Sequence, residues 1–481
     1  MSAQVTRPRT WQYTAGAATA GLALTAVAVT VAGPWDSSGQ RTAERDRAAA
    51  LGLTGGADHG RGSGTAQAGP EPAPSAASVL AGLGGVGSTV KSAPNGPAFA
   101  DVLGPLLKDA ALGGSRSGAV VDVATGKSLY GSHADRALTP ASTTKIATAV
   151  AALHAMGADH RLTTRTALEP GTKELVLVGG GDPTLTARKD ADGLASLRDL
   201  AARTATALKK DGVRQVTLSY DTTLYAGSAL HPIGKDANLA PVSALMADEG
   251  RTDDSTSGTA VRVDDPALDA TRKFAGFLED KGVKTTSPGP SKATDRAETL
   301  AEVSSPPLSA LVERMLTNSD NDLAEALARQ TAVATKVRAD FAGGGQAIRA
   351  QLEKLRLPVD GVTFKDGSGL NREDRLTAHL LTALLVKAGD PAHPELRPVL
   401  TGLPVAGFTG TLATRYADGA AGVVRAKTGT LTGVNALAGT VVDQEGRLLA
   451  FAFLASDTTS KEAAQSALDR TATALAACGC G

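Results

Sequence analysis

The sequence predicts a protein of mixed α/β class, of the α+β type, with a long insertion inside its folded part. Strand-like segments lie near both ends of the folded part, and helix-like segments lie between and after them. Further strand and helix material occupies the 177 positions between Ser142 and Ser319. A chain of 481 residues is long enough for more than one domain and a sizeable core.

The N-terminal region contains an uncharged stretch of 20 residues, Thr14 to Gly33, preceded by Arg7 and Arg9. This length suits a tilted helix that crosses a bilayer, and the preceding basic residues predict a short cytoplasmic segment at 1–13. A cleaved signal peptide is the other interpretation, with Thr30-Val31-Ala32 as its small-residue cleavage site. Both interpretations predict that most of the chain is extracytoplasmic, either membrane-anchored or secreted.

Residues 34–98 are rich in Gly, Ala, Ser and Pro and contain few large apolar side chains. Such a segment buries too little surface to fold, so we expect a disordered tether. At the other end, the tail 478–481 holds both cysteines, Cys478 and Cys480. A flexible tail is the favoured interpretation, and a local disulfide or a metal contact is the alternative.

Charge and histidine spacing exclude two classes of function. Lys+Arg and Asp+Glu both number 49, and this balance argues against a nucleic-acid partner. The seven histidines show none of the spacings typical of metal ligands. We therefore expect no catalytic metal and no cofactor.

The first folded elements are expected from about Phe99. A short helix at 102–107 is followed by a hairpin, with strands at 118–123 and 128–130. Pro140 suits the first turn of a helix that runs to about Met156. Further strands are expected at 174–178, 215–218, 422–428, 434–442 and 447–455, and further helices at 194–210, 266–281, 308–316, 322–331 and 459–477.

The first of three short motifs is Ser142-Thr143-Thr144-Lys145, at the start of the expected helix. A helix N-terminus offers free N–H groups and partial positive charge, which stabilise a developing alkoxide. Lys145 lies three residues on, on the same helix face, and a shielded lysine can accept the serine proton. When this motif is taken alone, an ordinary helix start with a solvated lysine is the favoured explanation, because S-x-x-K recurs often by chance.

The second motif is Ser319-Asp320-Asn321, in a turn between two expected helices. In the functional interpretation Ser319 relays a proton to the leaving amine and Asn321 donates a hydrogen bond to the substrate amide. In the structural interpretation these residues only cap a helix.

The third motif is Lys427-Thr428-Gly429, followed by Thr430, at the end of a strand. An extended peptide could pair with this strand, while Lys427 and the two threonine hydroxyls suit a terminal carboxylate. Gly429 lets a ligand approach the backbone closely. A strand end with a snorkelled lysine is the alternative. The three motifs together, in this order, favour acyl transfer over all three structural alternatives.

Through these motifs the chain resembles the serine penicillin-recognising superfamily, and is most similar to the D-alanyl-D-alanine carboxypeptidase/endopeptidase family, the low-molecular-mass class C penicillin-binding proteins. The likeness covers roughly 99–477. Four further segments are similar to that family: 179–185, 219–224, 366–371 (Asp-Gly-Ser-Gly-Leu-Asn) and 408–412 (Phe-Thr-Gly-Thr-Leu).

The resemblance implies a penicillin-binding-protein/β-lactamase-like catalytic domain with a five-stranded antiparallel sheet flanked by helices. That domain would consist of 99–165 and 301–477, with one or more inserted domains at 166–300. The resemblance also implies an acyl-enzyme on Ser142, an oxyanion hole at the backbone N–H groups of Ser142 and Thr430, peptidoglycan stem peptides as substrates and β-lactams as inhibitors.

Two other functions fit parts of the sequence. A β-lactamase needs a glutamate that activates the deacylating water. Glu353 follows Ser319 at a plausible distance, but its helix-like surroundings indicate a surface residue. An inactive peptidoglycan-binding protein is the third possibility, and the intact motif residues disfavour it.

Overall fold

The computed structural model describes residues 96–416 and 419–479. The expected membrane span or signal peptide at 14–33, the cytoplasmic segment before it and almost all of the tether at 34–98 lie outside the described residues. Within the described part, no helix is both long and apolar enough to cross a membrane.

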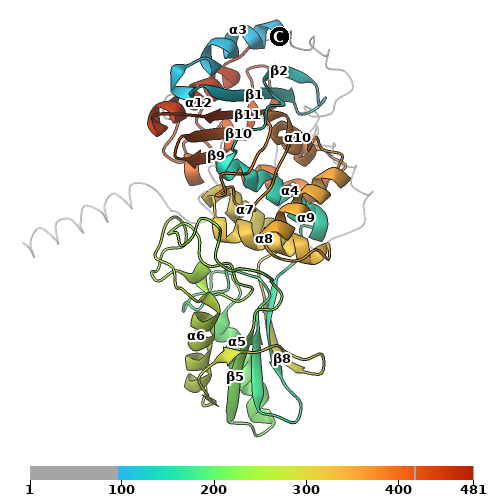
Figure 1. Cartoon of the computed structure of the whole chain (residues 1–481), viewed down its shortest axis with the longest axis vertical. Helices are drawn as coiled ribbons and strands as arrows, with labels where there is room; N and C mark the ends of the chain where they lie inside the picture. Colours follow the sequence, from blue (N-terminus) through green and yellow to red (C-terminus); the bar gives the residue numbers. More distant parts are fainter. Residues whose placement is uncertain (1–95, 417–418, 480–481) are drawn as a thin grey trace, which may run out of the picture. The chain divides into compact units, whose positions relative to one another are not determined.

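The first sheet has the five antiparallel strands that the family resemblance implies (Figure 1). Its strands are β1 (Ser115–Asp122), β2 (Ser128–Ser132), β9 (Val424–Leu431), β10 (Val434–Val442) and β11 (Leu448–Ser456). Their order is β2-β1-β11-β10-β9, so the N-terminal hairpin joins the three C-terminal strands through β1 and β11. Strands β10 and β11 are buried along almost their whole length, because helices cover both faces of the sheet.

Side-chain size differs between the two faces of this sheet. On β11, Phe451 and Phe453 pack in one core with α3 (Gly96–Leu107) and α12 (Lys461–Ala476). The alternate residues Ala450 and Ala452 belong to a second core. That core includes α4 (Thr144–Met156), α7 (Leu308–Asn318), α8 (Asn321–Ala334), α9 (Phe341–Lys354) and α10 (Ala378–Gly389). Successive strand residues face opposite sides, so small side chains let the motif-bearing helices approach the sheet closely.

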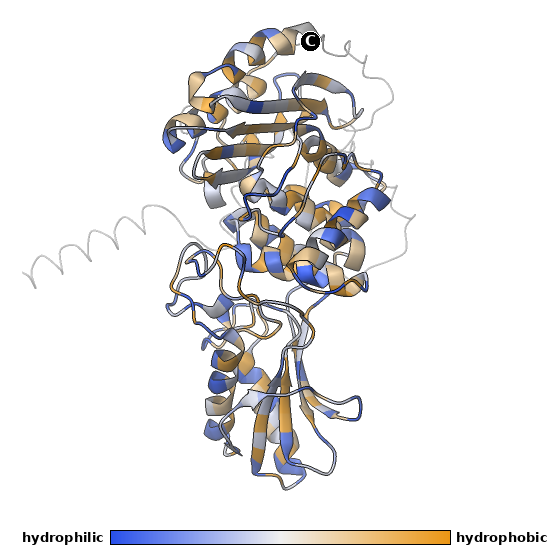
Figure 2. Cartoon of the chain, viewed as in Figure 1, coloured by the Kyte–Doolittle hydropathy of each residue, from blue (hydrophilic) through white to orange (hydrophobic). Residues whose placement is uncertain are grey.

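The second sheet is built from the chain between the first two motifs. Its strands are β3 (Thr163–Leu168), β4 (Glu174–Val178), β5 (Gln215–Asp221), β6 (Lys284–Thr285), β7 (Gly289–Pro290) and β8 (Glu298–Ser304). The order is β6-β5-β4-β3-β8, and β7 also pairs with β5. Helices α5 (Leu197–Lys210) and α6 (Pro266–Asp280) share a separate apolar core with this sheet, and Figure 2 shows apolar residues along its strands. The domain boundaries at 165/166 and 300/301 stay a prediction.

Short helical turns complete the described fold: η2 (Ala110–Leu112), η3 (Ala141–Thr143), η4 (Asp248–Gly250), η5 (Pro394–Leu396), α11 (Pro398–Thr401) and η6 (Gly410–Leu412). Three expectations need correction. Helix α3 begins at Gly96, ahead of the expected start of folded sequence at Phe99. The single helix expected from Pro140 is a 3₁₀ turn followed by α4. Cys478 is 5 % exposed and packs in the core with α12, so the tail is ordered at that residue.

Candidate active site

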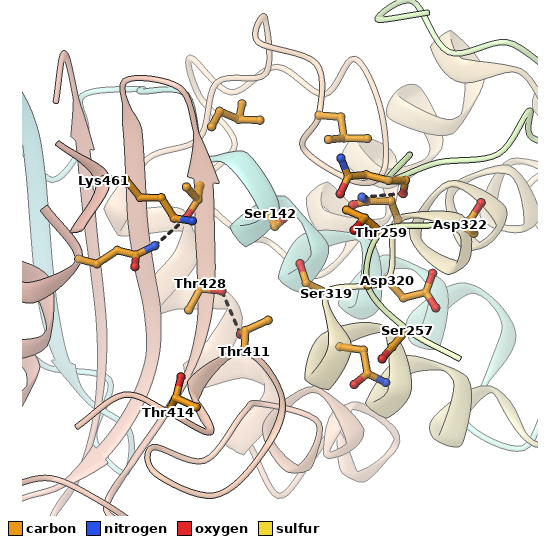
Figure 3. A pocket seen from close by; sticks show the side chains of 18 of the residues that line it. Ser142, Ser257, Thr259, Ser319, Asp320, Asp322, Thr411, Thr414, Thr428 and Lys461 are labelled. Carbon is orange, nitrogen blue, oxygen red and sulfur yellow. Dashed lines mark hydrogen bonds between the residues drawn. The ribbon is translucent and has the colours of Figure 1, made fainter. Parts of the chain in front are cut away.

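All three motifs border one pocket of about 520 Å³. Five of the predicted site residues line it: Ser142, Ser319, Asn321, Thr428 and Thr430. In Figure 3, Ser142 and Ser319 lie between Thr428 on the sheet side and the loop that carries Ser257 and Thr259. The structure therefore brings together residues that are almost 300 positions apart in the sequence.

A tight turn presents Ser142 to the pocket. Ala141, directly before it, has a φ of 48°, in the left-handed region that residues with a Cβ rarely adopt. Gly429 of β9 packs against this turn, and a Cβ at position 429 would come 2.5 Å from the carbonyl oxygen of Pro140. Only glycine allows this close approach, so the third motif helps to place the serine of the first.

The amine of Lys145 lies among three oxygens. Its Nζ is 3.0 Å from Ser142 Oγ, 2.6 Å from Asn321 Oδ1 and 2.7 Å from the carbonyl oxygen of Ser368. Lys145 is fully buried, and burial lowers its pKa to about 8 despite the opposing charges of nearby carboxylates.

These contacts orient the lone pair of the neutral lysine. The amide oxygen of Asn321 and the carbonyl oxygen of Ser368 can only accept hydrogen bonds, so each takes one N–H of a neutral amine. Ser142 Oγ, 3.0 Å away, is then the partner left for the lone pair. The geometry can therefore accept the serine proton directly.

The second motif occupies the sharp turn between α7 and α8, as predicted. Ser319 has a φ of 58° and ends α7, while the carboxylate of Asp320 caps α8 by accepting from Leu323 N–H. Asn321 Nδ2 donates to the carbonyl oxygen of Asn238, at 3.0 Å. An amide nitrogen has two hydrogens, so one remains for a ligand in the pocket.

The third motif lies on β9, which is the edge strand of the first sheet. Lys427 is fully buried and its Nζ donates to the carbonyl oxygen of Thr428, at 3.0 Å. Burial, reinforced by the charge of Lys145, places the pKa of Lys427 well below its usual value. The hydroxyls of Thr428 and Thr430 contact Thr411 Oγ1 and Gln465 Nε2, respectively.

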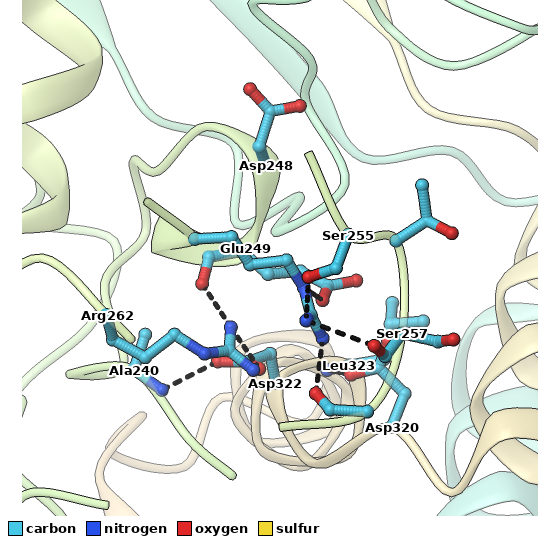
Figure 4. Close-up of polar contacts among 12 residues, drawn as sticks. Ala240, Asp248, Glu249, Ser255, Ser257, Arg262, Asp320, Asp322 and Leu323 are labelled. Carbon is cyan, nitrogen blue, oxygen red and sulfur yellow. Dashed lines mark hydrogen bonds and ion pairs between the residues drawn. The ribbon is translucent and has the colours of Figure 1, made fainter. Parts of the chain in front are cut away.

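Buried ion pairs connect one wall of the pocket, formed by the loop between η4 and α6, to the second motif (Figure 4). Arg262 forms an ion pair with Asp322 at 3.0 Å, and Arg251 forms one with Glu249 at 2.8 Å. Burial raises the pKa of both carboxyls to about 7, although the arginines oppose this shift. Glu249 also pairs with Arg314 of α7. The loop between η4 and α6 is thus held against the start of α8.

Several residues that line the pocket were not predicted as site residues from the sequence. The pocket is also lined by Arg251, Arg262, Thr411, Arg415, Lys461 and Gln465. The Ser368 carbonyl that binds Lys145 was not singled out either, although segment 366–371 carries the family likeness. Glu353 is an exposed residue paired with Arg349 on α9, as expected for a surface helix residue.

The fold and the placement of the three motifs define a serine hydrolase of the penicillin-recognising class. The structure of penicillin-binding protein 4 (dacB) from Haemophilus influenzae has this fold, with a TM-score of 0.64 at 20 % identity. The match covers 77 % of this chain and 97 % of that one.

The model of the D-Ala-D-Ala carboxypeptidase 3 (S13) family matches residues 100–260 and 252–475, and the chain belongs to this family. Carboxypeptidase Rv3627c of Mycobacterium tuberculosis is 35 % identical over 85 % of this chain and 90 % of its own length. Carboxypeptidase DacB of Mycolicibacterium smegmatis is 37 % identical over 76 % of this chain and 81 % of its own length. The D-alanyl-D-alanine carboxypeptidase of an Actinomadura strain is 32 % identical over 71 % of this chain and 78 % of its own length.

Proposed function

We propose that the chain is a serine DD-peptidase that cleaves the D-Ala-D-Ala bond of peptidoglycan stem peptides through an acyl-enzyme on Ser142. One observation carries the proposal most directly. The buried amine of Lys145 donates to two oxygens, Asn321 Oδ1 and the Ser368 carbonyl, which leaves its lone pair for Ser142 Oγ. Family membership and the named activity of the relatives support the same substrate class.

The proposed reaction begins when neutral Lys145 takes the proton of Ser142 as its Oγ attacks the carbonyl carbon of the penultimate D-Ala. The resulting oxyanion would be stabilised by the backbone N–H groups of Ser142 and Thr430. The C–N bond then breaks as Ser319 gives its hydroxyl proton to the leaving amine and recovers one from the protonated Lys145, which becomes neutral again. Water then attacks the ester: its hydroxyl completes the carboxyl group of the shortened peptide, and its other proton goes to Ser142 Oγ.

The remaining motif residues would bind the peptide. Asn321 has one amide N–H left for the substrate, and the outer edge of β9 can pair with an extended chain. Thr428 and Thr430 border the pocket, where their hydroxyls suit the terminal carboxylate, with Lys427 buried behind them. A D-Ala cross-link presents the same D-Ala carbonyl group to Ser142, with an amine of a second stem peptide as the leaving group, so we include endopeptidase cleavage. A β-lactam would acylate the same serine and act as an inhibitor.

The substrate is part of the cell wall, so we propose that the enzyme works outside the cytoplasm. The uncharged stretch at 14–33 would serve as a membrane anchor or as a cleaved signal peptide. Mass analysis of the N-terminus of the protein from its native host would separate these two forms. The intact N-terminus supports the anchor, and a new N-terminus after Ala32 supports the signal peptide.

The test uses two substrates and a matched pair of serine variants. The full chain should release D-Ala from a D-Ala-D-Ala tripeptide and become labelled by a fluorescent penicillin. Ser142→Ala should lose both activities, whereas Ser466→Ala, an exposed serine on α12, should keep them. A folded chain that neither releases D-Ala nor takes the label contradicts the proposal and favours an inactive wall-binding protein. Rapid turnover of penicillin would favour a β-lactamase instead.

A further inference from the structure

A loop next to Lys145, residues 366–371, supports its amine. Its Ser368 carbonyl oxygen accepts from Lys145 Nζ at 2.7 Å, and its Gly367 carbonyl oxygen accepts from Thr148 Oγ1 at 2.6 Å. Gly369 packs so tightly that a Cβ there would come 1.9 Å from the carbonyl oxygen of Ala141. The position of this loop therefore affects both the lysine and the turn that carries the serine.

The loop is shaped by two buried carboxylates. Asp366 accepts from the backbone N–H groups of Gly369 and Asn371, each at 2.7 Å. Glu325 of α8, one turn after Asn321, accepts from the N–H groups of Gly367 at 3.1 Å and Ser368 at 2.9 Å. Both carboxylates are almost fully buried, so their geometry depends on keeping every donor.

His231 supplies a further donor to Asp366 from a distant part of the sequence. It lies between β5 and η4, inside the segment that separates the first two motifs, and is 3 % exposed. Its Nε2 is 3.0 Å from Asp366 Oδ2, and its Nδ1 is 3.2 Å from the backbone nitrogen of Ile233. A backbone N–H can only donate, so Nδ1 accepts, and the proton of the neutral ring sits on Nε2.

We propose that His231 is a positioning residue for the acyl-transfer reaction: its hydrogen bond to Asp366 fixes the 366–371 loop, and the Ser368 carbonyl of that loop then aligns Lys145 with Ser142. The proposal rests on the proposed peptidase function. It assigns a catalytic consequence to His231 in the segment between β5 and η4, which also contributes Asn238 to the pocket and to the hydrogen bond with Asn321.

The need for such support follows from the geometry of the amine. The side chain of lysine is flexible, and the orientation of its neutral amine depends on the two acceptors that bind its N–H groups, Asn321 Oδ1 and the Ser368 carbonyl oxygen. If the Ser368 carbonyl shifts, the lone pair is free to turn away from the serine. A displacement of about 1 Å at a reacting group can lower a rate about 10²-fold.

A metal ion is a poorer explanation of this cluster. The ligand atoms of His231, Glu325 and Asp366 lie within 4.8 Å of one another, as metal ligands would. However, Nδ1 of the histidine and both carboxylates already accept hydrogen bonds from backbone N–H groups. These contacts indicate a network of protein hydrogen bonds.

The network also acts on Lys145 through charge. The charges of four carboxyl groups raise the pKa of the amine, in the order Asp366, Glu325, Asp320 and Asp374. Lys427 is the other basic group nearby, and the charge of Lys145 lowers the pKa of Lys427 in turn. Burial would raise the pKa of Asp366, but hydrogen bonds from His231, Asp374 and Gly369 lower it overall. Without the hydrogen bond from His231, the pKa of Asp366 would rise, and its carboxylate would carry a negative charge a smaller fraction of the time. The pKa of Lys145 should then fall, and the acid limb of the rate profile should move to lower pH.

A matched pair of variants separates positioning from packing. In His231→Gln the side-chain amide nitrogen takes the place of Nε2 and still donates to Asp366. In His231→Asn the amide reaches only the Nδ1 position and loses that donor. The control His379→Asn changes an exposed histidine whose Nδ1 contacts Asp135, on the solvent side of α10.

The readout is the rate of acylation by a fluorescent penicillin at saturating concentration, measured from pH 5.5 to 9 on the full chain. Circular dichroism confirms that each variant folds. H231N should acylate about 10²-fold more slowly, with its acid limb at lower pH and an unchanged half-saturating concentration. H231Q should stay within a few-fold of wild type, and H379N should match it.

Equal rates and pH profiles for H231N and wild type would overturn the positioning role. So would H231Q and H231N that are folded and equally slow, because the donor to Asp366 would then be irrelevant. If the wild-type chain takes no label, the peptidase function itself fails and the positioning role fails with it. If wild type and H231N are both labelled at the same rate, only the positioning role fails.

Discussion

Acylation of Ser142 should depend on pH through the ionisation of Lys145. Burial, the largest influence, lowers the pKa of Lys145 to about 8, and four nearby carboxyls oppose the shift. The base is the neutral amine, whose fraction rises with pH. At a pKa of about 8 this fraction is about 1 % at pH 6 and about 90 % at pH 9, so the rate should increase roughly 90-fold.

The assay is the second-order rate constant for labelling by a fluorescent penicillin, measured in half-unit steps between pH 6 and 9. Lys145→Arg keeps the positive charge but cannot act as a base, so its labelling should fall by about 10²–10⁴-fold at every pH. Lys387→Ala is the matched control, because Lys387 lies on α10 and pairs with Asp390. A flat profile for wild type, or near-normal labelling of Lys145→Arg, would refute the assignment of Lys145 as the base.

Three further outcomes follow from individual contacts. Gly429→Ala should slow labelling by the fluorescent penicillin about 10²-fold, because the added Cβ pushes β9 away from the turn that carries Ser142. Gly104→Ala is the control, because the space around its Cβ is open, and equal labelling rates for the two variants would contradict this prediction. Arg262→Ala should lower the free energy of unfolding in urea by about 3–5 kcal/mol, because Asp322 is left buried without its partner; a loss below about 1 kcal/mol would argue against it. Burial and the charge of Asp366 raise the pKa of Asp374 to about 10, so this carboxyl costs stability as pH rises above about 4. Asp374→Asn should therefore stabilise the fold by a few kcal/mol at pH 8 and much less at pH 4, and equal effects at both pH values would contradict this.

The parts of the site that are local in sequence were predictable. Ser142 and Lys145 are one helical turn apart, so their contact follows from the period of the helix alone. The turn that carries Ser319 follows from the two helical runs around it. The five-stranded sheet required the family resemblance as well, because strand order depends on pairings between distant segments.

The parts that depend on distant contacts were not predictable. The Ser368 carbonyl binds Lys145 across more than 200 positions, and a backbone oxygen leaves no residue-type signal. The contact between His231 and Asp366 joins two segments with no shared pattern. The left-handed backbone of Ala141 was also missed, because alanine gives no indication of it and the strain is held by packing against Gly429.

Mass spectrometry of the intact chain after incubation with benzylpenicillin tests the central claim most directly. We predict a mass increase equal to one penicillin molecule, because acylation opens the β-lactam ring without losing atoms. The adduct should map to the peptide that contains Ser142, and a D-Ala-D-Ala peptide should slow its formation. A folded chain with no adduct, or an adduct on another residue that survives Ser142→Ala, would contradict the account.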